Sequence, residues 1–290
     1  MLKVMWFVPP ALHRLAECGG RLAAGAVDAA STGSSDEQFE RLQQGRCDAV
    51  VTAMDNVVMW NRRPASAGYW IAAQIETTTA ISLVAAPGFA TVADLRGARL
   101  LVDSAVNGFV IALRALLDDA GIGFGDCAVI EAGGVRERFA DLTRGEGDAS
   151  LLGPPFVGMA EAQGLRRLAD LDSMFPGFPG QGIVVRRDIG GETRARTVAW
   201  LAALEAARAD ARADEARAVR ALLAAGMEAP LATTMARTVP AGLIPDPAGV
   251  ALIVRHRAQL GLPGGGDRYE ELVDPGLLVD ALAQAAIDPA

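Results

Sequence analysis

Short apolar runs and segments with helical spacing alternate along the first two-thirds of the chain. Apolar runs predict strands, and apolar residues that recur three or four positions apart predict helices. The expected strands are 2–8, 26–30, 48–53, 70–75, 80–85, 100–102, 167–170 and 182–187. Helices are expected over 10–24, 109–120 and 192–225, the last with a break near Asp214. This alternation predicts an α/β fold.

One pattern, F-x-x-L-x-x-G-x-x-D-A, occurs twice, over 39–49 and 139–149. Each copy predicts a helix that ends at a glycine in the left-handed conformation, followed by a short apolar strand and a loop. Ligands of open α/β sheets bind at loops that follow the carboxyl ends of strands. Two such units therefore predict two lobes with a ligand between them.

The 290 residues are enough for two lobes, and 51% of them are hydrophobic. The net charge of −8 and the lack of a basic block argue against nucleic acid and anionic membranes as partners, but they do not exclude an anionic small ligand. The three cysteines show no metal-binding spacing, so no metal site is expected. The glycines at 121, 123 and 125 do not make a dinucleotide fingerprint, and no cofactor is expected. No apolar run reaches the ~20 residues of a membrane span. No signal peptide is visible, which favours a cytoplasmic protein, or a periplasmic one if a leader was removed.

Three segments resemble type II periplasmic solute-binding proteins of ABC importers. They are TVADLRGARLLVDS (91–104), FADLTRGEGDASLLGPP (139–155) and YEELVDP (269–275). The most similar branch serves sulfonates, nitrate, taurine and thiamine-pyrimidine precursors. The resemblance covers most of the chain, and its motifs mark turns and packing rather than a ligand.

This resemblance implies a two-lobed type II fold that closes by a hinge motion. Two hinge strands would cross between the lobes, near Thr79–Ala85 and Gly182–Arg187. Lobe one would contain residues 1–80 plus 184–290, with a helical C-terminal third packed on it. Lobe two would contain residues 81–183.

The candidate ligand-binding residues lie at strand ends, at the first turn of a helix or at the expected hinge. They are Pro10, His13, Ser34, Ser35, Asp55, Asn56, Thr78, Thr79, Asp103, Ser104, Asn107, Gly153 and Pro154. Aspartates at such positions can accept hydrogen bonds from a ligand, or they can cap backbone N–H groups. The serines before the helix at 36 can bind an anion or cap that helix.

Three further polar residues are expected in solvent. They are Arg136, Arg138 and His256, each placed on a helix surface by the pattern around it. An arginine that reached the cleft instead would indicate a carboxylate or sulfonate ligand.

Two functional hypotheses follow. The first is a protein that binds a small organic solute, with an ABC permease as a candidate partner. The alternative is a cytoplasmic, cofactor-free enzyme on the same fold, a decarboxylase, dehydratase or isomerase of a small organic acid. In that case His13, with Asp55 or Asp103, would be the candidate acid–base pair.

Overall fold

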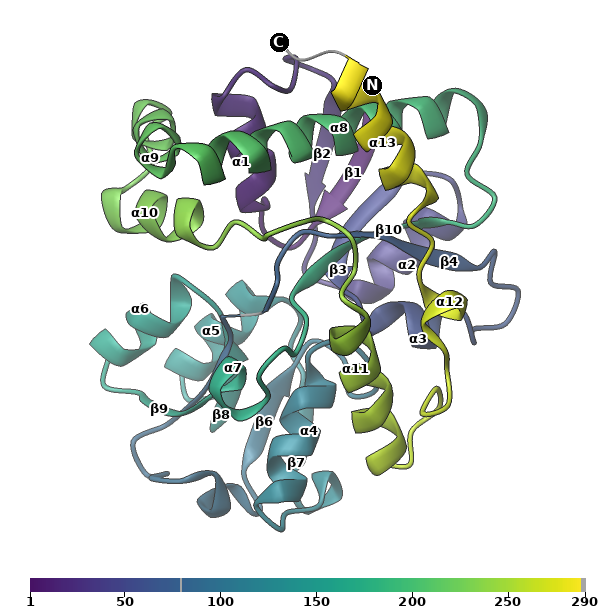
Figure 1. The fold of residues 1–290 in the computed structure, drawn as a ribbon. Helices are drawn as coiled ribbons and strands as arrows, with labels where there is room; N and C mark the ends of the chain where they lie inside the picture. The colour runs from purple at the N-terminus through teal and green to yellow at the C-terminus, as the bar shows by residue number, and fades with distance from the viewer. Residues whose placement is uncertain (79, 288–290) are drawn as a thin grey trace.

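The computed structural model describes residues 1–78 and 80–287, which form two α/β lobes, one above the other in Figure 1. Each lobe contains a five-stranded sheet. The beginning and the end of the chain lie together in the upper lobe, which we call lobe one, and the middle of the chain forms lobe two. The expected two-lobed α/β fold is therefore confirmed.

Lobe one contains a mixed sheet in the order β2-β1-β3-β10-β4. Its strands are β1 (Leu2–Trp6), β2 (Val27–Ser31), β3 (Ala49–Ala53), β4 (Tyr69–Gln74) and β10 (Gln181–Arg186). β1 pairs in parallel with β2 and β3, whereas β10 is antiparallel to β3 and β4. Every residue of β3 is buried, which explains its continuous apolar sequence.

Lobe two contains a second mixed sheet in the order β7-β6-β8-β5-β9. Its strands are β5 (Ser82–Ala85), β6 (Arg99–Val102), β7 (Ala128–Glu131), β8 (Ala149–Leu152) and β9 (Arg166–Asp170). β6 pairs in parallel with β7 and β8, and β5 is antiparallel to β8 and β9. The two sheets thus share one arrangement of parallel and antiparallel neighbours.

The repeated sequence pattern occupies equivalent places in the two lobes. In lobe one α2 (Ser35–Gln43) leads into β3, and in lobe two α5 (Val135–Thr143) leads into β8. The glycines that follow these helices, Gly45 and Gly145, have φ angles of 65° and 76°. Both are in the left-handed region, as the pattern predicts.

The repeated aspartate has the same role in both copies. Asp48 accepts a hydrogen bond from the backbone N–H of Lys3 (2.8 Å), and Asp148 accepts one from the backbone N–H of Arg99 (2.7 Å). Each carboxylate thus links the segment before its strand to the neighbouring parallel strand. The repeated pattern therefore has a structural role in both lobes, where it fixes a strand to its parallel neighbour.

Helices cover both sheets. Those of lobe one are α1 (Ala11–Cys18), α2, α3 (Asn56–Trp60), α8 (Gly191–Ala213), α9 (Glu215–Ala224), α10 (Ala229–Arg237), α12 (Tyr269–Leu272) and α13 (Gly276–Ile287). Those of lobe two are α4 (Val110–Asp119), α5, α6 (Phe156–Ala162) and α7 (Leu171–Met174). The break expected near Asp214 is confirmed, because Asp214 separates α8 from α9. None of the described helices is both long and apolar enough to cross a bilayer.

One helix of the C-terminal third departs from the prediction. α11 (Pro247–Gln259) packs against α4 of lobe two, whereas the whole third was expected on lobe one (Figure 1). Its residues Val250 and Ile253 belong to a hydrophobic cluster that also contains Val57 of lobe one and Ile111 of lobe two. α11 therefore links the lobes in addition to the two chain crossings.

The chain crosses from lobe one to lobe two between Gln74 and Ser82, and it returns between Asp170 and Gln181. The division expected after residue 80 lies in the first crossing. The division expected after residue 183 falls within β10, which pairs entirely with lobe-one strands. The second crossing therefore comes before the predicted position.

We predict that Gly145→Ala lowers the free energy of unfolding by about 1 kcal/mol, because a Cβ at positive φ is strained. No other atom lies within 4 Å of that Cβ position, so the effect isolates the backbone conformation. Gly158→Ala in α6 is the control, since it also meets open space and should stabilise the helix by roughly 0.5–1 kcal/mol. Urea unfolding of both variants measures the difference. Equal stabilities would contradict the left-handed cap.

Candidate functional site

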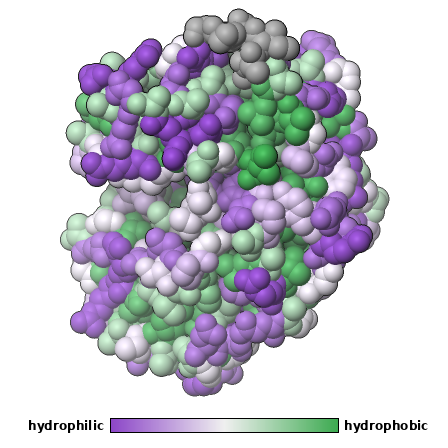
Figure 2. All heavy atoms as spheres, viewed as in Figure 1, coloured by the Kyte–Doolittle hydropathy of each residue, from purple (hydrophilic) through white to green (hydrophobic). Residues whose placement is uncertain are grey.

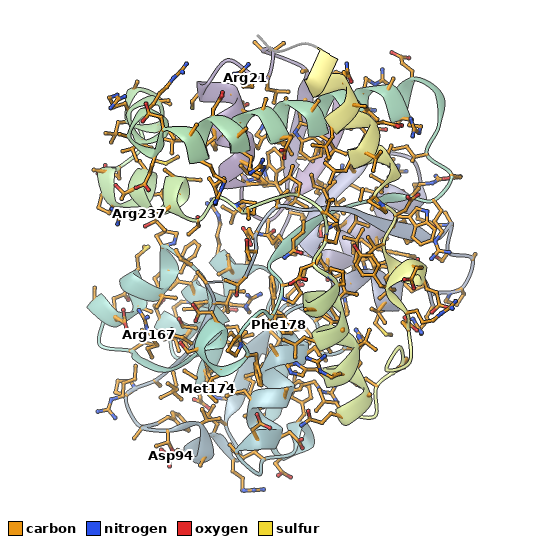
Figure 3. All side chains as sticks on the ribbon, in the orientation of Figure 1. Arg21, Asp94, Arg167, Met174, Phe178 and Arg237 are labelled. Carbon is orange, nitrogen blue, oxygen red and sulfur yellow. The ribbon has the colours of Figure 1, made fainter. Side chains whose placement is uncertain are left out.

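A cavity of about 620 Å³ lies between the two lobes. Residues 7–12 after β1 and residues 52–53 at the end of β3 line it from lobe one, and residues 101–104 at the end of β6 line it from lobe two. Figure 2 shows the surface hollowed between the lobes, and Figure 3 shows Arg237 of α10 beside this opening. Cavities of this volume at the carboxyl ends of strands are typical small-molecule sites.

The structure places eight of the candidate residues in the lining of this cavity. They are Pro10, Asn56, Thr78, Asp103, Ser104, Asn107, Gly153 and Pro154. His13, Ser34, Ser35 and Asp55 do not line it. Thr79 lies outside the described residues.

The expectation that His13 faces the cleft is wrong. Its ring lies in the core of lobe one, 4.8 Å from the ring of Trp6, and Trp200 Nε1 donates a hydrogen bond to its Nδ1 (3.3 Å). The other ring nitrogen, Nε2, lies 3.3 Å from Glu17. Burial lowers the pKa of His13. α1 turns this side chain toward α8 because its buried face packs there, while Pro10 remains at the cavity.

The two serines take supporting positions. Ser34 caps α2, accepting hydrogen bonds from the backbone N–H groups of Asp36 (3.2 Å) and Glu37 (3.4 Å). Ser35 is buried, and hydrogen bonding to it lowers the pKa of Asp103. The geometry matches the cap for Ser34, whereas Ser35 is the first residue of α2 and does not cap it.

Asp55 forms a buried ion pair instead of facing the cavity. Arg257 Nε donates to Asp55 Oδ1 (2.6 Å), and Arg257 Nη2 donates to Asp55 Oδ2 (2.5 Å). The backbone N–H of Gly108 donates to the same Oδ2 (2.8 Å). Both side chains are almost completely excluded from solvent. The carboxylate is therefore occupied by protein donors.

Arg257 also reaches two backbone carbonyl groups. Its Nη2 donates to Val106 O (3.2 Å), and its Nη1 donates to Pro263 O (2.9 Å). The guanidinium thus joins α11 to the loop at 104–108 of lobe two and to Asp55 of lobe one. The bidentate geometry suits arginine, whose planar group matches a carboxylate.

Four polar side chains continue this network along the cavity wall. Asn56 donates to Thr52 Oγ1 (2.6 Å), and Ser104 donates to Asn107 Oδ1 (2.6 Å). Asn107 donates to Asn56 and so closes the chain between the lobes. Buried polar groups need such partners, and here they find them across the lobe boundary. All four of these residues line the cavity.

The lobes also approach each other closely on the side of α5. A Cβ built on Gly134 of lobe two would lie 3.2 Å from Gly33 Cα and 3.2 Å from a ring carbon of Phe7, both in lobe one. Glycine is required at such a backbone approach. Gly134 directly precedes α5, whose residues Val135 and Arg138 line the cavity.

Arg138 of α5 lines the cavity, contrary to its expected place in solvent. Its Nε donates to Ser150 Oγ (3.2 Å), its Nη1 to Gly133 O (2.7 Å) and its Nη2 to Leu151 O (3.2 Å). All three acceptors are neutral, and no carboxylate oxygen of the described residues lies within 4.0 Å. Burial lowers the pKa of this guanidinium, against the nearby charges of Asp103 and Glu137.

Asp103 faces the same cavity from the end of β6. Its Oδ1 is buried and has no hydrogen-bond partner among the described residues. Burial raises its pKa to about 6, although Arg138 and Ser35 lower it. The cavity therefore contains an arginine and an aspartate that do not form an ion pair with each other.

His256 is buried as well, so its expected place in solvent is also wrong. Its ring lies 4.6 Å from Phe175 and 5.7 Å from Phe178. The buried side of α11 thus includes both His256 and Arg257. In the sequence they follow Arg255, and such a run of basic residues is typical of a helix surface. Within residues 1–78 and 80–287, no group of three or more His, Cys, Asp or Glu side chains could hold a metal ion.

Comparison with solved structures confirms the expected fold. The chain is similar to the periplasmic nitrate-binding protein NrtA from Synechocystis PCC 6803, with a TM-score of 0.79 and 11% identity over 99% of this chain and 89% of that one. It is also similar to a ligand-binding component of an ABC-type import system from Staphylococcus aureus with zinc bound (TM-score 0.76, 15% identity, 97% and 98% covered). The aliphatic sulphonate-binding protein SsuA from Escherichia coli gives a TM-score of 0.68 at 19% identity, with 94% and 92% covered. The sequence matches no protein-family model and no curated protein.

We predict that Asp55→Ala lowers the free energy of unfolding by about 3–5 kcal/mol, because it leaves the Arg257 charge buried without a partner. The double variant Asp55→Leu/Arg257→Met should recover part of this loss. Denaturant unfolding measures both. Glu146→Ala, which removes an exposed pair with Arg144, is the control and should change little. A small effect of Asp55→Ala would contradict the role of the ion pair.

Proposed function

We propose that this chain is a solute-binding protein that holds a small organic anion in the cleft between its lobes. The unpaired Arg138 in the cavity wall is the observation that carries this proposal. Arg138 is only partly exposed, and a charged side chain that is shielded from water in this way is stabilised by a counter-charge. Arg138 has neutral partners, so an anionic ligand group would supply the missing charge.

The size and the lining of the cavity support an organic ligand. About 620 Å³ is within the range of sites for small organic molecules, and it far exceeds the volume of a simple inorganic anion. Apolar side chains such as Phe7, Val8, Ile81 and Phe109 line much of it. We infer a carboxylate or sulfonate with an apolar body, whose acidic group binds Arg138.

The similar structures support this class of function. Their names describe nitrate binding, sulphonate binding and a component of an ABC-type import system. By analogy, we propose an ABC permease as the partner that receives the solute. This role would require the protein to act outside the cytoplasmic membrane.

Two of the residues that the enzyme alternative requires as acid–base groups, His13 and Asp55, do not line the cavity. His13 lies in the core against Trp6 and Trp200, and Asp55 is paired with Arg257. Asp103 would remain as an acid–base group without its expected partner. The geometry therefore favours binding over turnover.

We predict that Arg138→Gln weakens binding of the solute about 10- to 100-fold, the loss typical of a charge-assisted hydrogen bond. The solute is first identified by native mass spectrometry of the freshly purified protein. Its affinity is then measured by calorimetry. Arg136→Gln is the matched control, because Arg136 is exposed on the same helix. Unchanged affinity in Arg138→Gln, or an equal loss in both variants, would overturn the proposal.

A further inference from the structure

The two lobes share one hydrophobic core beside α11. A single cluster of buried side chains contains Val57 and Trp60 of α3 in lobe one, Ile111 of α4 in lobe two, and Val250 and Ile253 of α11. Two further clusters each stay within one lobe. Separation of the lobes beside α11 would therefore expose apolar surface that is now buried, which is unfavourable in water.

α11 also packs on the segment by which the chain returns to lobe one. A Cβ built on Gly249, near the start of α11, would lie 3.2 Å from Gly177 O and 3.3 Å from a side-chain carbon of Pro179. Further along the helix, the ring centroid of His256 lies 5.7 Å from that of Phe178. α11 is therefore in contact with both lobes and with one of the two segments that connect them.

The hydrogen bonds across this junction converge on two consecutive residues of lobe one, Asp55 and Asn56. Asp55 accepts from Arg257 of α11 and from the backbone N–H of Gly108, and Asn56 accepts from Asn107. Contacts that meet at one point permit rotation about that point but resist separation. The buried ion pair adds to this resistance, because separation would leave two buried charges without partners.

The mouth of the cavity, between α10 of lobe one and α6 of lobe two, has a different character. It lies at the left in Figures 1 and 2, whereas α11 lies further to the right. Thr233 and Thr234 of α10 donate to carbonyl groups of their own helix, and Arg237 pairs with Glu215 of α9. Among the described residues, α10 forms no hydrogen bond or ion pair with lobe two.

Two further contacts join the lobes away from α11, and both are weaker than the buried ion pair. Gly134 approaches Gly33 and Phe7 by van der Waals contact, and Asp103 is hydrogen-bonded to Ser35. Such contacts are individually small, whereas a buried ion pair is costly to break. We therefore expect these contacts to separate before those beside α11.

We propose that α11 and the Asp55–Arg257 pair form the pivot about which the two lobes turn. The cleft then opens at the mouth between α10 and α6 and stays closed beside α11. Arg257 is in this sense a positioning residue, because it does not line the cavity but fixes the direction in which the cavity opens. The inference concerns the motion of the protein and does not depend on the identity of the solute.

Double electron–electron resonance between two spin labels, one on each lobe, measures this motion in the whole chain. All labels are placed at exposed positions. The mouth pair is Arg212→Cys in α8 with Met159→Cys in α6. The pivot pair is Glu270→Cys in α12 with Asp119→Cys in α4, and both of these helices pack against α11.

The native thiols are kept from labelling by Cys18→Ser and Cys127→Ser, while Cys47 is buried and is retained. Bound small molecules are removed by dialysis, and native mass spectrometry checks that the protein is empty. We expect the distance distribution of the mouth pair to be about twice as wide as that of the pivot pair, because displacement grows with distance from a hinge.

A double variant tests whether the ion pair is responsible. Asp55→Leu/Arg257→Met removes both charges and keeps apolar side chains in their place, so the distribution of the pivot pair should widen roughly to that of the mouth pair. The matched control is Arg21→Met/Asp210→Leu, which removes a bidentate ion pair (2.7 and 3.0 Å) within lobe one. It should leave both distributions unchanged.

The comparison of the two label pairs decides the inference even if the double variant does not fold. Equal widths of the two distributions, or a wider one for the pivot pair, would overturn the pivot. A folded double variant whose pivot pair keeps its narrow distribution would overturn the role of Arg257. Neither result affects the proposed function, which depends on the separate affinity measurement with Arg138→Gln.

Discussion

The buried ion pair between Asp55 and Arg257 is the interaction on which the arrangement of the two lobes depends. It fixes α11 against both lobes, because Asp55 belongs to lobe one and the loop at 104–108 belongs to lobe two. A buried ion pair is tolerated when hydrogen bonds satisfy its polar atoms. Here both carboxylate oxygens of Asp55 and all three guanidinium nitrogens of Arg257 form hydrogen bonds. The same loop supplies Ser104 and Asn107 to the cavity wall. The shape of the cleft therefore depends on a residue pair that does not touch it.

The cavity itself follows from the duplicated design of the lobes. Each sheet ends its parallel strands toward the cleft, so the loops after β1, β3 and β6 meet there. The repeated F-x-x-L-x-x-G-x-x-D-A pattern builds the joint between a helix and a strand in both lobes. None of the residues of either copy lines the cavity, although Arg138, which does, directly precedes the second copy. In both lobes the loops at the strand ends line the cavity, whereas the repeated pattern stabilises the connection between a helix and a strand.

Much of the fold was predictable from the sequence, because the buried strands are continuous apolar runs and the cap glycines mark helix ends. The position of α11 was not, since a helix that carries Arg255, His256 and Arg257 looks solvated until its partners are known. His13 and Asp55 were wrongly placed at the cleft for a related reason. A polar residue near a strand end can face a ligand, or it can satisfy a distant partner such as Trp200 or Arg257. Only the tertiary structure decides between them.

The most direct test of the central claim is a crystal structure of the protein with its co-purified solute. The account predicts an acidic group of the solute within about 3 Å of the Arg138 guanidinium. The Asp55–Arg257 pair should remain intact behind the cavity wall. A solute whose acidic group is bound at Arg237 near the mouth, or one without an acidic group, would contradict the account.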